Sequence, residues 1–290
     1  MKRSCMVFGE VLYDVYPTHK KLGGAPFNFG AHFAKLGGKS YIYSAVGNDA
    51  LGAEIFSEVN ALGVDTSYLA VTDGIPTGAC SVSYNGDSPV YELKDNVSYD
   101  NIPFNAKAAL PELDIFYFGT LALRHEPSLK TWKELLFSVR AKEKFLDLNL
   151  RGDFYSDLMI REVLSAATAV KLNREEYAHL AEIFSIEGEI HDFCRRLCRD
   201  FEIKLLIVTL DKDGALAYDA RRDELVRRSA KQGSFVSAVG AGDSFSACFM
   251  FNYLLGAPLS ACIEKATELA SLVVSVEAAI PEYDGSKFKV

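Results

Sequence analysis

Short runs of apolar residues alternate along the chain with segments whose apolar residues recur every three or four positions. A short uninterrupted apolar run is typical of a buried strand, whereas the i, i+4, i+7 spacing of Phe29, Phe33 and Leu36 is typical of an amphipathic helix. Repeated strand-helix units predict an α/β fold with a mostly parallel central sheet and helices on both faces. We expect strands at 5–8, 41–46, 115–118, 144–147, 167–172 and 205–209, and helices at 28–36, 51–62 and 127–141.

Two segments, 13–22 and 78–99, depart from this rhythm and resemble antiparallel strands instead. Asn85-Gly86 within the second segment is a strong hairpin signal. We interpret both segments as a small β excursion from a single domain spanning 1–290, because no repeat or linker divides the chain. Pattern alone leaves open whether this excursion is a lid over a site at the carboxyl edge of the sheet or a decorated edge.

Composition narrows the class of protein. The chain has 290 residues, 49% of them hydrophobic, which is typical of a soluble globular protein. Its net charge is −8 and no run of Lys or Arg exceeds two residues, so we expect no nucleic-acid partner. No stretch approaches the roughly 18 to 20 apolar residues that span a bilayer, and no signal peptide precedes Gly9-Glu10. We therefore expect a cytoplasmic protein with no membrane partner.

The six cysteines are scattered through the chain, so we expect reduced thiols. Cys194 and Cys198 stand one helical turn apart, but no second ligand pair with zinc spacing accompanies them. We interpret them as small packed residues of a helix.

The most informative segment is Gly240-Ala241-Gly242-Asp243, which leads into an apolar helix. Its glycines let the backbone approach a ligand, and the start of the helix offers N–H groups to an anion. An acid in the first turn is commonly explained by the helix dipole alone. Beside a bound phosphate, however, an ionised Asp243 would repel the ligand. That cost would be offset in a phosphoryl transfer if Asp243 served as the base that deprotonates the acceptor hydroxyl.

Further candidate residues lie near the start and in the middle of the chain. Gly23 and Gly24 would let a polyol approach the backbone and Asn28 could bond its hydroxyls, although Asn28 could equally cap a helix. Asn149 and Arg151 follow the strand ending at Asp147, where ligands of open α/β sheets gather, or form a satisfied polar turn.

Asn173 and Glu176 have the spacing of a capping box. The same residues could orient a hydrated Mg²⁺ beside nucleotide phosphates, and the spacing does not separate the two interpretations. Gly37-Gly38-Lys39-Ser40 mimics the end of a P-loop, but the first glycine of that motif would fall at Phe33. Residues 240–245 lack the third glycine of a dinucleotide-binding fingerprint.

These segments occur in the order typical of the ribokinase/PfkB carbohydrate kinases, which the chain resembles from Gly9 to beyond Asp243. The resemblance implies a ribokinase-like fold with a β lid, and ATP and Mg²⁺ as the cosubstrate and metal. It implies Asp243 as the base and an anion hole at Gly240, Ala241 and Gly242. The implied sugar-binding residues are Asp14, Gly23, Gly24, Asn28, Asn149 and Arg151; the implied ATP-binding residues are Asn173, Thr209, Gly214, Gly240 and Gly242, with Glu176 reaching the metal through water.

Within this family, residues 147–151 and 119–122 look most like those of bacterial fructokinases and 2-keto-3-deoxygluconate kinases. We expect ATP-dependent phosphorylation of a primary hydroxyl of a small sugar, with fructose as the first choice. The alternatives are 2-keto-3-deoxygluconate, another sugar or a nucleoside, and, from another class, a catalytically silent sugar-binding regulatory protein.

One position departs from the family pattern. Ser237 stands where many relatives have an Asp that helps to bind an activating monovalent cation, so the resemblance does not extend to potassium activation. An exposed face of the β excursion could pair two subunits into a homodimer, as in several relatives, although nothing in the sequence requires it.

Overall fold

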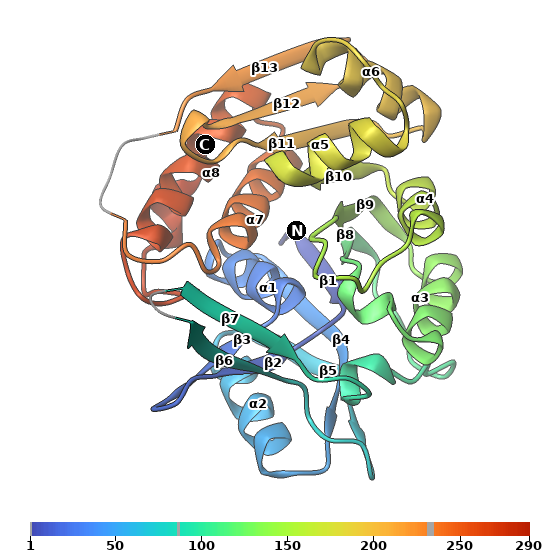
Figure 1. Ribbon diagram of the computed structural model, residues 1–290, viewed down its shortest axis with the longest axis vertical. Coiled ribbons are helices and arrows are strands. Elements are labelled where there is room, and N and C mark those ends of the chain that lie inside the picture. The colour runs from blue at the N-terminus through green and yellow to red at the C-terminus, as the bar shows by residue number, and fades with distance from the viewer. Residues whose placement is uncertain (1, 86–87, 231–234) are drawn as a thin grey trace.

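The protein is described here by a computed structural model that covers residues 2–85, 88–230 and 235–290. Its centre is a nine-stranded sheet in the order β13-β12-β11-β10-β9-β8-β1-β4-β5 (Figure 1). All neighbouring strands from β11 to β5 are parallel, whereas β12 pairs antiparallel with both β11 and β13. The strands are β1 (Ser4–Phe8), β4 (Lys39–Gly47), β5 (Val64–Thr72), β8 (Leu113–Phe118), β9 (Ala141–Asp147), β10 (Ala169–Leu172), β11 (Leu205–Thr209), β12 (Ala215–Asp219) and β13 (Glu224–Arg228).

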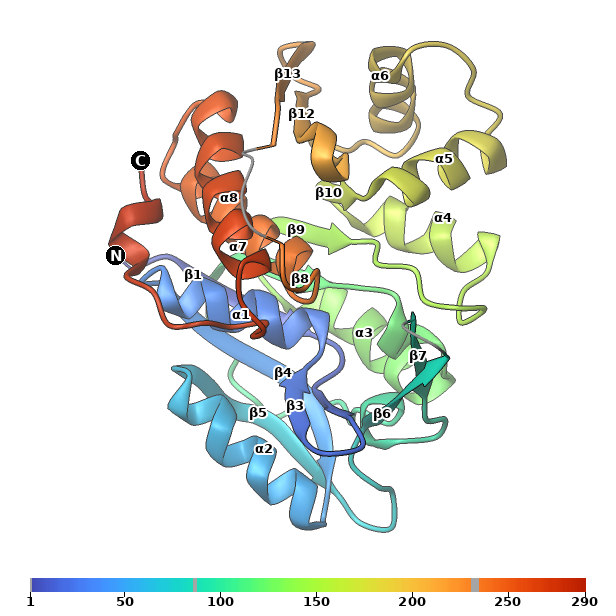
Figure 2. The ribbon, with the colours of Figure 1, turned by 60° about the vertical axis from the view of Figure 1, so that its left-hand side comes forward.

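Helices cover both faces of this sheet, and a separate apolar core fills each interface. Figure 2 shows α1, α7 and α8 on one side of the sheet and α3, α4 and α5 on the other. One core includes residues of α1 (Ala25–Lys35), α2 (Ala50–Ala61), α7 (Ala241–Leu254) and α8 (Leu259–Val274). The other includes residues of α3 (Glu126–Ser138), α4 (Asp157–Ala166), α5 (Arg174–Ile183) and α6 (Ile190–Asp200).

The β excursion is a second, four-stranded sheet in the order β3-β2-β6-β7. It combines β2 (Leu12–Val15) and β3 (Lys20–Gly23) with β6 (Ala79–Asn85) and β7 (Ser88–Leu93). Each of these two pairs is antiparallel as predicted, but β2 and β6 pair in parallel, so the sheet is mixed. Of the predicted Asn85-Gly86 turn, Gly86 lies outside the described residues.

The predicted fold class is confirmed, and each of the predicted strands and helices has a counterpart. Helix α1 begins at Ala25 rather than at residue 28, because Gly24 with φ 111° is its N-cap and Pro26 fits its first turn. Asn28 therefore does not cap this helix. Helix α3 ends at Ser138 rather than at 141, because Val139 is already extended and β9 follows directly.

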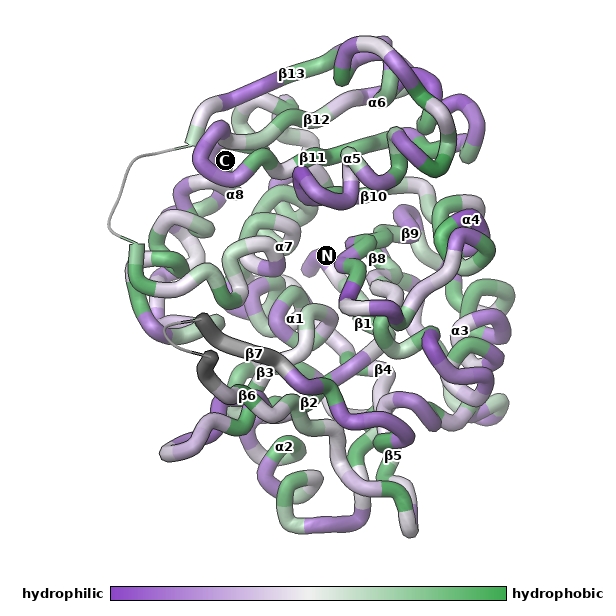
Figure 3. Tube along the Cα trace, viewed as in Figure 1, coloured by the Kyte–Doolittle hydropathy of each residue, from purple (hydrophilic) through white to green (hydrophobic). Residues whose placement is uncertain are grey.

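Figure 3 shows how hydropathy follows this architecture, with purple and green alternating along the outer helices and green predominating in β11. All six residues of β8 are buried, as a central parallel strand requires. All six cysteines are buried and free, and Cys194 and Cys198 lie on the buried face of α6, as predicted for packed helix residues. Within the described ranges, no helix has the length and apolar character needed to cross a membrane.

Candidate active site

The carboxyl ends of the central parallel strands bring the predicted site residues toward one edge of the sheet. Strand β9 ends at Asp147, β10 ends just before Asn173, and β11 ends at Thr209. Strand β1 leads through Glu10 into β2, which holds Asp14. This edge is where open α/β sheets bind their ligands.

Helix α7 begins at this edge with the predicted anion-binding loop. Gly240 is its N-cap and has a left-handed backbone with φ 78°, which favours glycine. Ser244 donates the first intrahelical bond, to the Gly240 carbonyl oxygen at 2.9 Å. The N–H groups of Gly242 and Asp243 precede that bond, so they are placed as donors for an anion.

Asp243 lies in the first turn of α7 and is partly buried. Asn28 of α1 donates a hydrogen bond from Nδ2 to Asp243 Oδ2 at 2.7 Å, although the two residues are 215 positions apart. Burial and the Asp147 carboxylate raise the pKa of Asp243 to about 6, against the opposing effects of Asn28, Lys171 and Arg151. The structure thus brings a carboxylate of increased basicity to the predicted anion-binding loop.

A buried lysine supplies positive charge beneath the loop. Lys171 in β10 is 6% exposed, and its Nζ lies 3.0 Å from Asp147 Oδ1. A Cβ atom at Gly242 would lie 3.3 Å from this Nζ, so the ammonium directly underlies the loop. Ser246 donates to the other Asp147 oxygen at 2.9 Å. The sequence analysis assigned no role to Lys171. The feature that could have identified it is a charged residue inside an apolar strand.

Four of the predicted sugar-binding residues, namely Asp14, Gly23, Gly24 and Asn28, lie at or near the start of α1. A Cβ at Gly23 would lie 3.1 Å from Asp14 Oδ2, and one at Gly24 would lie 2.5 Å from the Glu10 carbonyl oxygen. Gly24 therefore requires the close backbone approach that glycine permits, whereas a side chain at Gly23 would only displace the Asp14 carboxylate slightly. Burial raises the pKa of Asp14, while the positive charges of Arg151 and Lys21 lower it.

Glu10 is an unpredicted acid at the same place. It is 3% exposed, and its Oε2 has no hydrogen-bond partner among the described residues. Burial raises the pKa of Glu10 to about 7, and hydrogen bonds from backbone groups including Ala25 oppose that rise. In the sequence, only the position of Glu10 directly after the first predicted strand pointed to a place in the site.

Asn149 and Arg151 lie in the loop after β9. Asn149 has a left-handed backbone with φ 44°, and Thr120 donates to the Leu148 carbonyl oxygen beside it at 2.9 Å. Arg151 is exposed, and its charge acts on both Asp14 and Asp243. The loop therefore brings a cation to the group of carboxylates.

On the predicted nucleotide side, Asn173 and Glu176 form the capping box. The Glu176 carboxylate is buried and accepts bonds from the backbone N–H groups of Leu150 at 2.9 Å and Asn173 at 2.8 Å. Thr209 ends β11, with Oγ1 3.4 Å from the Leu172 carbonyl oxygen. Gly214 has φ 91°, and a side chain there would overlap the Arg228 carbonyl, so packing already requires this glycine. The roles of these residues toward ATP stay predictions.

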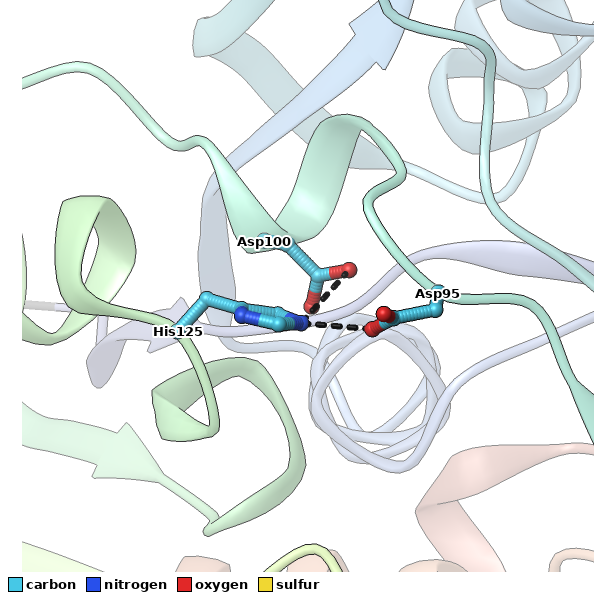
Figure 4. Close-up of side chains that lie close together, drawn as sticks. All are labelled: Asp95, Asp100 and His125. Carbon is cyan, nitrogen blue, oxygen red and sulfur yellow. Dashed lines mark hydrogen bonds and ion pairs between the residues drawn. The ribbon is translucent and has the colours of Figure 1, made fainter.

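A second polar cluster lies where the β excursion returns to the main sheet. Figure 4 shows His125 pointing toward Asp95 and Asp100, with Nε2 2.6 Å from Asp95 Oδ1. Arg124 is buried over the Phe154 ring and donates to both Asp100 oxygens, at 2.7 and 2.8 Å. Because the guanidinium already neutralises Asp100, we interpret the cluster as an ion-pair network that anchors the excursion.

Comparison with known proteins decides the family. The model of the pfkB family of carbohydrate kinases matches residues 2–284. The chain belongs to this family. It is therefore a sugar kinase, and the family predicted from the order of the motifs is confirmed.

Individual relatives agree with this assignment. The kinase is 28% identical over 253 residues to a putative sugar kinase of Pyrococcus horikoshii, covering 84% of this chain and 76% of that protein. It is 28% identical over 265 residues to a fructokinase of Escherichia coli, covering 85% and 83%. A crystal structure of a Vibrio cholerae fructokinase with fructose, ADP and calcium bound has a TM-score of 0.79 at 22% identity, covering 96% of this chain and 94% of that one.

Proposed function

We propose that this sugar kinase transfers the γ-phosphoryl group of ATP to a primary hydroxyl of a small neutral sugar, with fructose as the first choice. The observation that carries the proposal is the contact between Asn28 and Asp243 at the anion-binding loop, with the Lys171 ammonium beneath it. Relatives named fructokinase, such as those of Escherichia coli and Rhizobium leguminosarum, support the choice of sugar.

In this proposal the sugar lies between α1 and the β excursion, which acts as a lid. Asp14 and Asn28 bond its hydroxyls, Gly23 and Gly24 let it approach the backbone, and the 149–151 loop closes the far side. Asn28 suits this role because Oδ1 is buried and has no partner in the described ranges, while Nδ2 already bonds Asp243. Closure of the lid would exclude water from the transfer.

Asp243 acts as the base. The acceptor oxygen attacks the γ-phosphorus, the bond from that phosphorus to the bridging oxygen breaks, ADP leaves, and Asp243 takes the hydroxyl proton. With a pKa of about 6, Asp243 is ionised at neutral pH yet more basic than an ordinary aspartate. The Gly242 and Asp243 N–H groups could each contribute about 3 kcal/mol to transition-state stabilisation.

ATP would lie beside Asn173, Thr209, Gly214 and the anion-binding loop. Mg²⁺ would supply charge neutralisation between the phosphates. The Glu176 carboxylate is 3% exposed and both its oxygens accept backbone bonds, so it does not fit a direct ligand. We retain it only as an outer residue that acts through water and holds Asn173 in place. Ser237, which departs from the family pattern, gives no support to potassium activation.

Charge favours a neutral acceptor over a keto-deoxy acid. The exposed Arg151 interacts with Glu10, Asp14 and Asp243, and Lys171 is paired with Asp147. These carboxylates would oppose the carboxylate of an acidic sugar. The intact base and both loop glycines also disfavour the catalytically silent alternative.

A panel of acceptors assayed with Mg·ATP tests this proposal. The panel contains fructose, other hexoses and pentoses, 2-keto-3-deoxygluconate and a nucleoside, ranked by kcat/KM from ADP release. We expect fructose to rank first. Preference for the acid or the nucleoside would refute the proposed substrate, and binding of sugar and ATP without any transfer would establish the silent alternative.

A further inference from the structure

His32 is a fully buried imidazole that the proposed mechanism does not use. It lies in α1 four residues after Asn28, so both side chains project from the same face of the helix. Asn28 contacts Asp243, the last residue of the anion-binding loop. His32 faces the C-terminal segment that packs on the first residue of that loop.

Both ring nitrogens of His32 have partners. Nε2 lies 2.9 Å from the Ala279 carbonyl oxygen, and Nδ1 lies 2.7 Å from the Tyr283 hydroxyl. A carbonyl oxygen only accepts, so Nε2 holds the hydrogen and Nδ1 accepts from Tyr283. Burial lowers the pKa of His32 to about 4, which keeps the ring in this neutral form.

The Ala279 carbonyl lies between His32 and the loop. A Cβ at Gly240 would lie 2.7 Å from the Ala279 oxygen and 2.9 Å from its Cα, so the two backbones are in close contact. The oxygen that accepts from His32 is thus the atom against which Gly240 packs. Gly240 in turn makes the left-handed bend with which α7 begins.

We propose that His32 is a positioning residue for phosphoryl transfer, holding the Ala279 carbonyl so that Gly240 keeps the bend that aims the loop N–H groups. Helix α1 then supports the loop at both ends, through His32 and Ala279 at Gly240 and through Asn28 at Asp243. This inference rests on the proposed role of the loop 240–243. Small displacements of preorganised donors are costly, because a misplacement of about 1 Å can lower a rate about 10²-fold.

Two amide substitutions separate this role from simple core packing. In His32→Gln the amide reaches the position of Nε2 and can still donate to Ala279, whereas in His32→Asn it reaches only the position of Nδ1. We expect His32→Gln to keep kcat within about 3-fold and His32→Asn to lose about 10- to 100-fold, with KM for the sugar within about 2-fold in both. Tyr283→Phe, which leaves the Ala279 bond in place, is the matched control and should keep near-normal kcat.

The variants are assayed as folded full-length protein, with circular dichroism and thermal unfolding as the check. Equal kcat values for His32→Gln and His32→Asn, or a loss in Tyr283→Phe as large as in His32→Asn, would overturn the inference. If His32→Asn does not fold, His32→Met, which lacks a donor, replaces it in the same comparison.

Asp243→Asn is measured in parallel to separate this inference from the proposed function. Normal kcat in Asp243→Asn would overturn the proposed role of the loop. Loss in Asp243→Asn together with normal kcat in His32→Asn would overturn only the role of His32.

Discussion

Replacing Asp243 with asparagine is expected to make the folded protein more stable at neutral pH. Burial and the Asp147 charge raise the pKa of Asp243 from 3.8 to about 6. The folded state therefore binds this proton more tightly than the unfolded state, and ionisation of Asp243 costs stability. A shift of about two units corresponds to about 3 kcal/mol. Because the Asp243 residue as a whole is only partly buried, we expect a gain of about 1–3 kcal/mol.

Urea unfolding of both proteins at about pH 7.5 and about pH 5 measures this gain. The asparagine is neutral at both values and can still accept the Asn28 bond. The gain should be complete above about pH 6, fall to about half by pH 5, and vanish below the unfolded-state pKa. A variant less stable than the wild type at pH 7.5, or a gain that does not shrink in acid, would refute the reasoning.

Three further predictions concern the same region. The kcat/KM for the acceptor should fall as pH decreases through about 6, because protonated Asp243 cannot accept the proton; a flat profile down to about pH 5 would contradict this. Lys171→Met leaves the buried Asp147 charge unpaired, so urea unfolding should show a loss of about 3–5 kcal/mol. Adding Asp147→Leu should restore most of it, and no loss in the single variant would refute the pairing. Arg124→Met should lower the free energy of unfolding by about 3 kcal/mol, because the buried Asp100 carboxylate loses its ion-pair partner, and should raise KM for the sugar. Unchanged stability and KM would show that this network does not anchor the excursion.

The parts of the fold that sequence predicted well are those with an unambiguous pattern. Central strands such as β8 are buried throughout, and residues 115–118 of β8 form a continuous apolar run. Strand β5 was not predicted because it lies at the edge of the sheet and alternates buried with half-buried and exposed residues. Strand β13 was missed because it is largely exposed, and β12 was missed because it is short and two of its five residues are alanines, which are weak strand formers. The parallel pairing of β2 with β6 joins two distant segments, and no local pattern indicates its direction.

The candidate site shows the same division. The loop 240–243 was predictable because glycines before a helix have a direct physical meaning. The role of Lys171 could not be predicted, because it depends on contacts with Asp147 and Gly242, which belong to other elements. The contact of His32 with Ala279 spans 247 positions, and only the packed structure reveals it.

The central claim is that Asp243 is the base of a sugar kinase whose anion hole is the loop before it. The most direct test is kcat for the best acceptor in the folded Asp243→Asn variant, with sugar binding measured separately by calorimetry. Sugar affinity should stay within about 3-fold while kcat falls by about 10²- to 10⁴-fold. A variant that keeps near-normal kcat would contradict the assignment.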